Sequence, residues 1–97
     1  MGYDLRISSR LYNVTFDYEG SLLQGYLERS WRKSLHTGED YHISKKQVGE
    51  LVTFMKDENS KSKEVEGRNV FSTIKVDTME SMYKTMENKE TAIFHYW

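Results

Sequence analysis

Histidines and carboxylates that lie close together in the sequence are the residues of this chain that could bind a metal. His36 and His42 flank a short polar stretch containing Glu39 and Asp40, and His95 lies near the end of the chain. Imidazole nitrogens and carboxylate oxygens are common ligands of divalent cations. Their spacing matches no metal pattern, such as two histidines one helical turn apart. The sequence therefore predicts neither a metal site nor a cofactor.

Catalysis by a nucleophile or by an acid–base pair also lacks a matching pattern. No serine stands in a Gly-x-Ser-x-Gly turn, and the six glycines are scattered singly rather than gathered in a phosphate loop. The carboxylates available for an acid–base pair lie in polar segments, where solvation leaves them without the tuning that catalysis needs. They are Glu39, Asp40, Glu64 and Glu66. We therefore expect a protein that is not an enzyme.

Composition narrows the classes of partner. The chain has 97 residues, 37% of them hydrophobic and 30% charged, which suits a single domain spanning residues 1–97. Its 14 Lys and Arg nearly balance its 15 Asp and Glu, which excludes both a broadly basic nucleic-acid binder and an acidic DNA mimic. Because there is no cysteine, disulfides and cysteine-bound metals are excluded as well.

The hydropathy pattern predicts neither a membrane-spanning segment nor a signal peptide for export. Mean hydropathy is -0.77, and no apolar run approaches the roughly 20 residues of a membrane span. The opening residues Met1 to Asp4 lack the basic stretch leading into an apolar one that marks a signal peptide. We expect a cytoplasmic protein without membrane contact.

Alternating apolar and polar residues at the start of the chain predict two strands. Tyr3 to Ile7 and Tyr12 to Tyr18 each place apolar side chains on one face, and the short polar turn between them favours a hairpin.

Two amphipathic helices are expected next. An apolar stripe at helical spacing runs from Leu22 to Leu35, and a shorter one runs from Val48 to Met55. Gly38 is a natural end for the first helix. Capping-box pairs stand at both helix starts; they are Ser21 with Gln24 and Ser44 with Gln47.

The rest of the chain predicts an exposed connection, a strand, a helix and a final strand. Residues 57–68 contain a single aliphatic residue and are expected to be the connection. Val70 to Val76 is rich in β-branched residues and predicts a strand, Met79 to Met86 a helix, and Thr91 to Trp97 the closing strand.

The predicted fold is therefore α+β, in the order β-β-α-α-β-α-β. A sheet of about four strands, with three helices packed mainly on one face, buries every apolar stripe at once. The last strand and the strand before it are far enough apart in sequence for a parallel crossover. If one sheet face is left uncovered, Ile93 and Trp97 of the closing strand lie on it. The alternative is that the closing strand is central in the sheet and that both of its faces are partly buried.

The end of the first helix and the following loop are the favoured partner site. Tyrosine and arginine are frequent anchors of protein interfaces, and the two signs of charge can orient a partner. The candidate residues, including the closing tryptophan, are Arg29, Arg32, Lys33, Glu39, Asp40, Tyr41, His42 and Trp97. The C-terminal strand is a second candidate surface, because two copies of the chain can pair through its face or its edge to form a homodimer.

Two other kinds of binding stay open. A basic helix end with Arg29, Arg32 and Lys33, together with aromatics on an open sheet face, suits a small nucleic-acid-binding protein. An oligomeric protein that binds a small ligand is a further alternative, and ligand-dependent stabilisation would reveal it.

The chain opens with Tyr3-Asp4-Leu5-Arg6-Ile7, followed by Leu11-Tyr12-Asn13-Val14-Thr15. Over about the first 20 residues this pattern resembles small accessory proteins encoded by bacteriophages. It implies an inhibitor or modulator, for example an anti-CRISPR or other anti-defence protein, that covers the surface of a bacterial host protein or nucleoprotein complex. No functional residue is implied by the resembling stretch.

Overall fold

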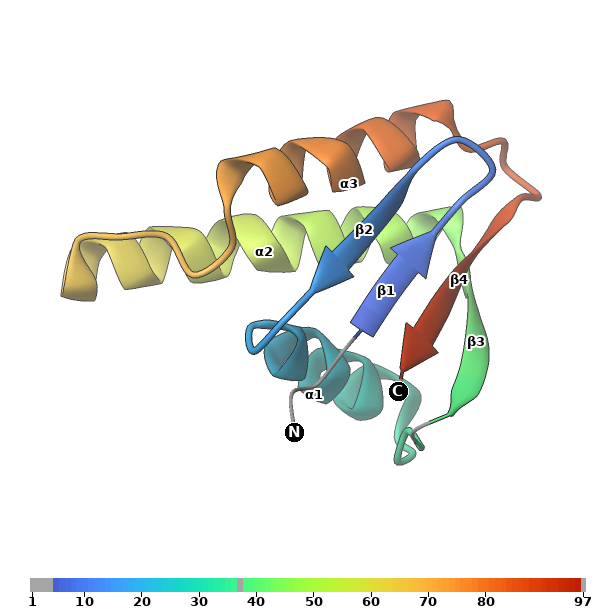
Figure 1. Cartoon of the computed structure of the whole chain (residues 1–97), viewed down its shortest axis with the longest axis horizontal. Coiled ribbons are helices and arrows are strands. Elements are labelled where there is room, and N and C mark those ends of the chain that lie inside the picture. Colours follow the sequence, from blue (N-terminus) through green and yellow to red (C-terminus); the bar gives the residue numbers. More distant parts are fainter. Residues whose placement is uncertain (1–4, 37, 97) are drawn as a thin grey trace.

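Four strands and three helices follow one another in the order β-β-α-β-α-α-β (Figure 1). The computed structural model describes residues 5–36 and 38–96. The elements are β1 (Leu5–Ser8), β2 (Asn13–Phe16), α1 (Gly20–Trp31), β3 (Glu39–Ser44), α2 (Lys45–Glu66), α3 (Thr73–Thr85) and β4 (Thr91–Tyr96).

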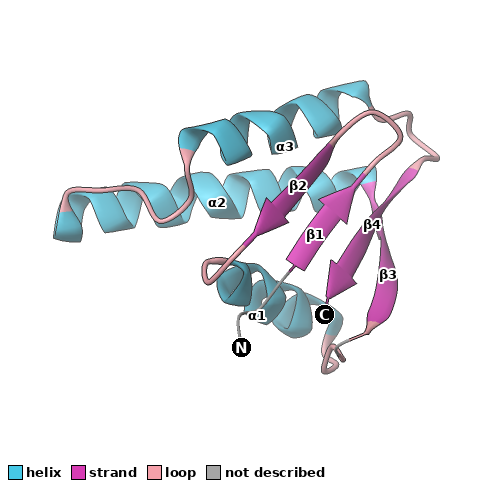
Figure 2. Ribbon diagram, viewed as in Figure 1, coloured by secondary structure: helices cyan, strands magenta, loops and turns pink. Residues whose placement is uncertain are grey.

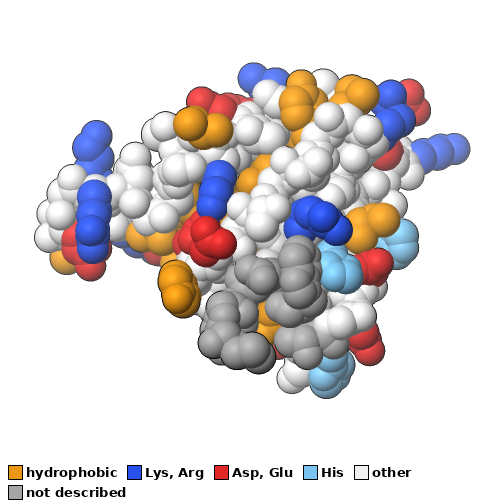
Figure 3. Space-filling view, viewed as in Figure 1, with side chains coloured by type: hydrophobic (Ala, Val, Ile, Leu, Met, Phe, Trp, Pro, Cys, Tyr) orange, Lys and Arg blue, Asp and Glu red, His pale blue; other side chains and the backbone are white. Residues whose placement is uncertain are grey.

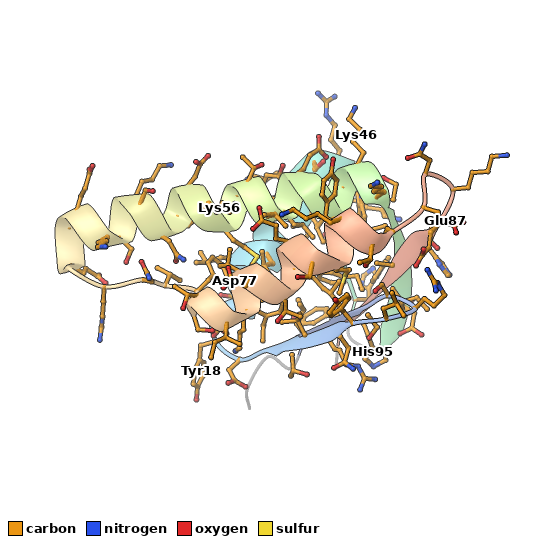
Figure 4. The ribbon with its side chains drawn as sticks, turned by 90° about the horizontal axis from the view of Figure 1, so that it is seen from above. Tyr18, Lys46, Lys56, Asp77, Glu87 and His95 are labelled. Atoms are coloured by element: carbon orange, nitrogen blue, oxygen red, sulfur yellow. The ribbon has the colours of Figure 1, made fainter. Side chains whose placement is uncertain are left out.

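The strands form one antiparallel sheet in the order β2-β1-β4-β3. All three helices pack against the same face of the sheet, which is the face turned away from the viewer in Figure 2. The sheet is seen along its edge in Figure 4, with α2 and α3 on one side of it. The predicted α+β class, with a four-stranded sheet and helices on one face, is confirmed.

The hydrophobic core lies between the sheet and the helices. One cluster of buried side chains draws residues from all seven elements, and no described polar or charged residue is buried within it. None of the helices in the described residues is both long enough and apolar enough to cross a membrane.

The third strand is Glu39–Ser44, and not the predicted segment from Val70 to Val76, so the element order differs from the expected one. The strand has only two core-side apolar residues, Tyr41 and Ile43, and pairs with β4 along its whole length. The β-branched segment instead leads into α3, because Ser72 caps that helix through its side-chain oxygen.

Residues 57–68 are largely exposed, as expected, but they continue α2 as far as Glu66. They contain good helix formers and no glycine before Gly67, which ends the helix at a φ of 76°. Beyond Met55 the helix has no buried residue, and it extends past the sheet as an arm (Figure 1). The Asn59 side chain connects this arm to the loop between α2 and α3 through hydrogen bonds to the Phe71 backbone.

The ends of α1 also differ from the prediction. Glu19 is the N-cap, and the hydroxyl of Ser21 donates to the Tyr18 carbonyl (3.0 Å) instead of capping the helix. The helix ends at Trp31, well before Gly38, because Arg32 adopts a left-handed conformation with φ of 57°. The second capping box, Ser44 with Gln47, is confirmed by both of its hydrogen bonds.

The C-terminal strand is an inner strand of the sheet. β4 is antiparallel to β1 on one side and to β3 on the other. The expected parallel crossover is therefore wrong. Homodimerisation through the edge of β4 is also excluded, because both edges of this strand are already paired.

Candidate functional site

The sheet face that the helices leave uncovered, called here the open face, carries polar side chains in cross-strand rows. The strand register places Thr15, Arg6, His95 and Asp40 in one row, and Asn13, Ser8, Ile93 and His42 in the next. In the space-filling view of this side, histidines lie beside both acidic and basic side chains (Figure 3). The open face therefore offers both signs of charge around one apolar side chain, Ile93, which is 38% exposed.

A carboxylate–imidazole pair joins β3 to β4 on the open face. The Asp40 carboxylate contacts His95 Nδ1, and these two residues are direct cross-strand neighbours. Two residues along, His42 Nδ1 lies 3.4 Å from the Thr91 hydroxyl. The His95 label in Figure 4 lies on the side of the sheet away from α2 and α3. These contacts fix the charged side chains of β3 in a defined arrangement.

The outer edge of β3 borders a shallow hollow, called here the β3 rim. It has a volume of about 470 Å³ and is lined by Trp31, Lys33, Asp40, Tyr41 and His42. The Trp31 and Tyr41 rings lie 5.9 Å apart, and the Lys33 ammonium lies over both, 5.6 and 5.5 Å from their centroids. The rim thus combines a cation–aromatic cluster with an exposed acid and an exposed imidazole.

The loop after α1 is held to the β3 rim by hydrogen bonds. The Leu35 amide donates to the Glu28 carboxylate (2.7 Å), and the His36 amide donates to the Tyr41 phenol oxygen (2.8 Å). The phenol in turn donates to the Glu39 carboxylate (2.9 Å). The His36 amide lowers the pKa of Tyr41, but burial and the Glu39 carboxylate outweigh it, so this pKa is raised. The phenol stays protonated and keeps both bonds.

Most of the predicted site residues come together at the rim. Lys33, Asp40, Tyr41 and His42 line it directly, and Glu39 reaches it through Tyr41.

The two predicted arginines lie outside the rim. The Arg29 guanidinium lies beside Gly25 on α1, and Arg32 is an exposed residue at the helix end. Trp97 lies outside the described residues.

Three residues of this region were not predicted as site residues. Trp31 belongs to the apolar stripe of α1, yet it is only half-buried and forms one wall of the rim. Its position two residues before Lys33 is the local signal for this role. His95 and Arg6 join the open face only through strand pairing, and no short-range pattern in the sequence indicates that pairing.

A hollow larger than the β3 rim, about 880 Å³, lies on the helical side and is open to solvent. Its charged residues include Lys56, which bonds Glu80 (2.9 Å), and Lys45, whose ammonium lies 5.3 Å from the Tyr83 ring centroid. The hydrogen bond from Lys56 lowers the pKa of Glu80. This hollow lies between α2 and its neighbours, and Lys56 and Glu80 in its lining form an ion pair with each other.

Among residues 5–36 and 38–96, no three histidine or carboxylate side chains converge on one point as metal ligands would. No protein-family model, curated protein sequence or solved structure matches this chain.

Proposed function

We propose that this protein is a non-enzymatic binding protein that covers a surface of another protein with its open face and β3 rim. The observation that carries the proposal is the sheet face without helices, whose exposed side chains carry both charge signs and adjoin the Trp31–Tyr41–Lys33 cluster. Aromatic and cationic groups held in place by a rigid scaffold suit a protein interface.

The Asp40–His95 pair fits recognition better than catalysis. The Asp40 side chain is 54% exposed at a shallow, open hollow, whereas catalytic pairs are typically enclosed in a cleft that tunes them. In recognition, the same pair presents an oriented acid and imidazole to a partner.

The phage resemblance of the opening residues supplies the class of partner. In this proposal the target is a protein of a bacterial cell, met in the cytoplasm, and inhibition is steric. An anti-defence role, such as that of an anti-CRISPR protein, is one form of such inhibition.

Binding to nucleic acid is less well supported. Within the described part of the sheet, the strand aromatics Phe16, Tyr41, Phe94 and Tyr96 have the parity of the helical face, which removes them from any role in stacking bases on the open face. Glu39 and Asp40 also place negative charge beside Lys33, where a phosphate backbone would be repelled.

Capture from bacterial lysate tests the proposal, with nuclease-treated and untreated arms. We expect the wild type to retain one discrete protein in both arms. The double variant I93D/H42E should recover at least about tenfold less of this protein than the wild type does, since a charge replaces the central apolar contact. The matched control K61E, on the exposed arm of α2, should bind like the wild type.

Two results would contradict the proposal. One is recovery that disappears with nuclease, and the other is equal recovery by the open-face variant and the wild type. Salt gives an independent check. A complex built on about 6–10 phosphate contacts loses roughly 10³–10⁵ in affinity between 50 and 200 mM salt. We expect a loss below about tenfold for a protein interface with few ion pairs.

A further inference from the structure

β3 is an edge strand whose outer side is unpaired in the described structure. In the order β2-β1-β4-β3 it pairs with β4 alone, and it is six residues long, whereas the opposite edge strand, β2, has four. An edge strand presents backbone N–H and C=O groups that can pair with another strand. The hollow of the β3 rim lies along this edge, where an added strand would place its side chains.

We propose that β3 pairs with β3 of a second copy of this chain, antiparallel and about a two-fold axis beside Tyr41. The two four-stranded sheets then form one sheet of eight strands. The axis is perpendicular to the sheet, so the helices of both copies lie on one side and the two open faces on the other. This goes beyond the proposed function: in the dimer the second copy, and not the other protein, lies along the β3 rim, and the two open faces stay exposed for the other protein.

Charge favours this register over the two adjacent symmetric ones. Directly opposed residues lie on the same face of a sheet, so only pairings of even-numbered with even-numbered, or odd with odd, residues are allowed. A register centred on Asp40 opposes two like charges, and one centred on His42 opposes two imidazoles. The register centred on Tyr41 opposes Asp40 to His42 of the second copy, twice, and such opposite pairs favour strand pairing.

Both side chains of this pair are available. His42 and Asp40 are exposed on the open face, and the known contact of His42 uses Nδ1, so Nε2 points to other partners. Asp40 contacts His95 of its own chain, but a carboxylate has about four acceptor positions and can also accept from a second imidazole. On the helical side, Tyr41 of one copy faces Tyr41 of the other.

Size gives a reason for pairing. The open face of one copy spans only four strands of four to six residues each. A standard protein interface takes roughly 800 Å² of accessible surface from each partner. The paired sheet doubles the platform without changing the fold of either copy.

Sedimentation velocity on the pure protein tests the inference. Between about 5 and 200 µM at pH 6.0, we expect the mass to rise towards twice the 11.5 kDa of the chain. The variant H42D opposes two carboxylates and should weaken dimerisation about tenfold, two cross-strand pairs being lost. The exchange variant D40H/H42D again places a carboxylate opposite an imidazole and should recover most of the loss. A monomer at every concentration overturns the inference, as does equal dimerisation by H42D and the wild type.

Cross-linking tests the register separately. The chain has no cysteine, so one introduced cysteine gives an unambiguous disulfide. Under mild oxidation we expect Y41C to form a covalent dimer at least about tenfold faster than D40C, H42C or the arm control K61C, since only directly opposed residues meet disulfide geometry. Equal rates at all positions overturn the inference. Sedimentation and cross-linking both use the pure protein without any target protein. Dimerisation can therefore fail while lysate capture succeeds, and lysate capture can fail while dimerisation succeeds.

Discussion

Adjacent residues of β4 lie on two surfaces with opposite properties. Phe94 is fully buried against the helices, whereas its neighbour Ile93 is 38% exposed on the open face. On the covered face apolar packing is closed and no described polar residue is buried. On the open face polar and charged side chains stand in rows. The covered face therefore supplies the burial that favours folding, whereas the open face presents polar and charged side chains to solvent.

The largest difference in stability between the two faces should appear when Phe94 and its neighbour Ile93 are each replaced by alanine. We expect Phe94→Ala to lower the free energy of unfolding by about 3–5 kcal/mol, because it removes buried surface and leaves a cavity. Ile93→Ala should change it by less than about 1 kcal/mol, since Ile93 is partly solvated in the folded state. Urea denaturation followed by circular dichroism measures both. Equal losses would show that the open face is covered in solution.

A smaller difference in stability is expected between two asparagines, Asn59 on the helical side and Asn13 on the open face. Asn59 Nδ2 donates to the Phe71 carbonyl (2.9 Å), and the Phe71 amide donates to Asn59 Oδ1 (2.8 Å), which fixes the turn between α2 and α3. Asn59→Ala should cost about 1–3 kcal/mol, because it leaves two partly buried backbone groups unpaired. The control Asn13→Ala, exposed on the open face, should cost less than about 0.5 kcal/mol. If thermal unfolding gives both variants the same midpoint, the turn is not held by this contact.

Two ion pairs provide the finest comparison. Glu19 accepts a hydrogen bond from Lys75 (2.7 Å) with its side chain 17% exposed, whereas Asp40 in the Asp40–His95 pair is 54% exposed. Burial raises the pKa of Glu19, but the hydrogen bonds from Lys75 and backbone amides outweigh it, so this pKa is lowered. The stabilisation is therefore present above the unfolded-state pKa and is lost as the pH falls through the folded-state value.

We expect Glu19→Gln to lower the free energy of unfolding by about 0.5–1 kcal/mol at pH 7. This difference from the wild type should fade between about pH 5 and pH 3. Asp40→Asn should cost less than Glu19→Gln at pH 7. Urea midpoints measured across this pH range decide the matter, and a constant offset for Glu19→Gln would refute the role of the Glu19 charge.

Local signals in the sequence were reliable where no distant residue competed with them. The capping box of Ser44 and Gln47 forms as expected because both partners lie within one turn. The similar pair at Ser21 does not form, because a tight turn after β2 carries the chain into α1 with Glu19 as its N-cap. There Gly20 packs closely against the sheet: an added Cβ would lie 3.2 Å from Leu5 Cβ.

The β3 rim was only partly predictable, because some of its contacts join residues that are far apart in the sequence. Lys33, Tyr41 and His42 are near in sequence, and their types indicated a binding surface. Their exact neighbours, Trp31 as a wall and His95 as the partner of Asp40, follow from α1 ending early and from β4 pairing with β3.

By itself the sequence determined the α+β class, the number of helices, the closing strand and the mixed-charge segment after α1, because alternation, helical spacing and composition are local properties. Only the tertiary structure decided that Glu39–Ser44 is a strand, that residues 57–66 are helical and that β4 is an inner strand. These choices depend on pairing and packing between residues far apart in the chain, whose free energy exceeds the weak local preferences of the segments involved.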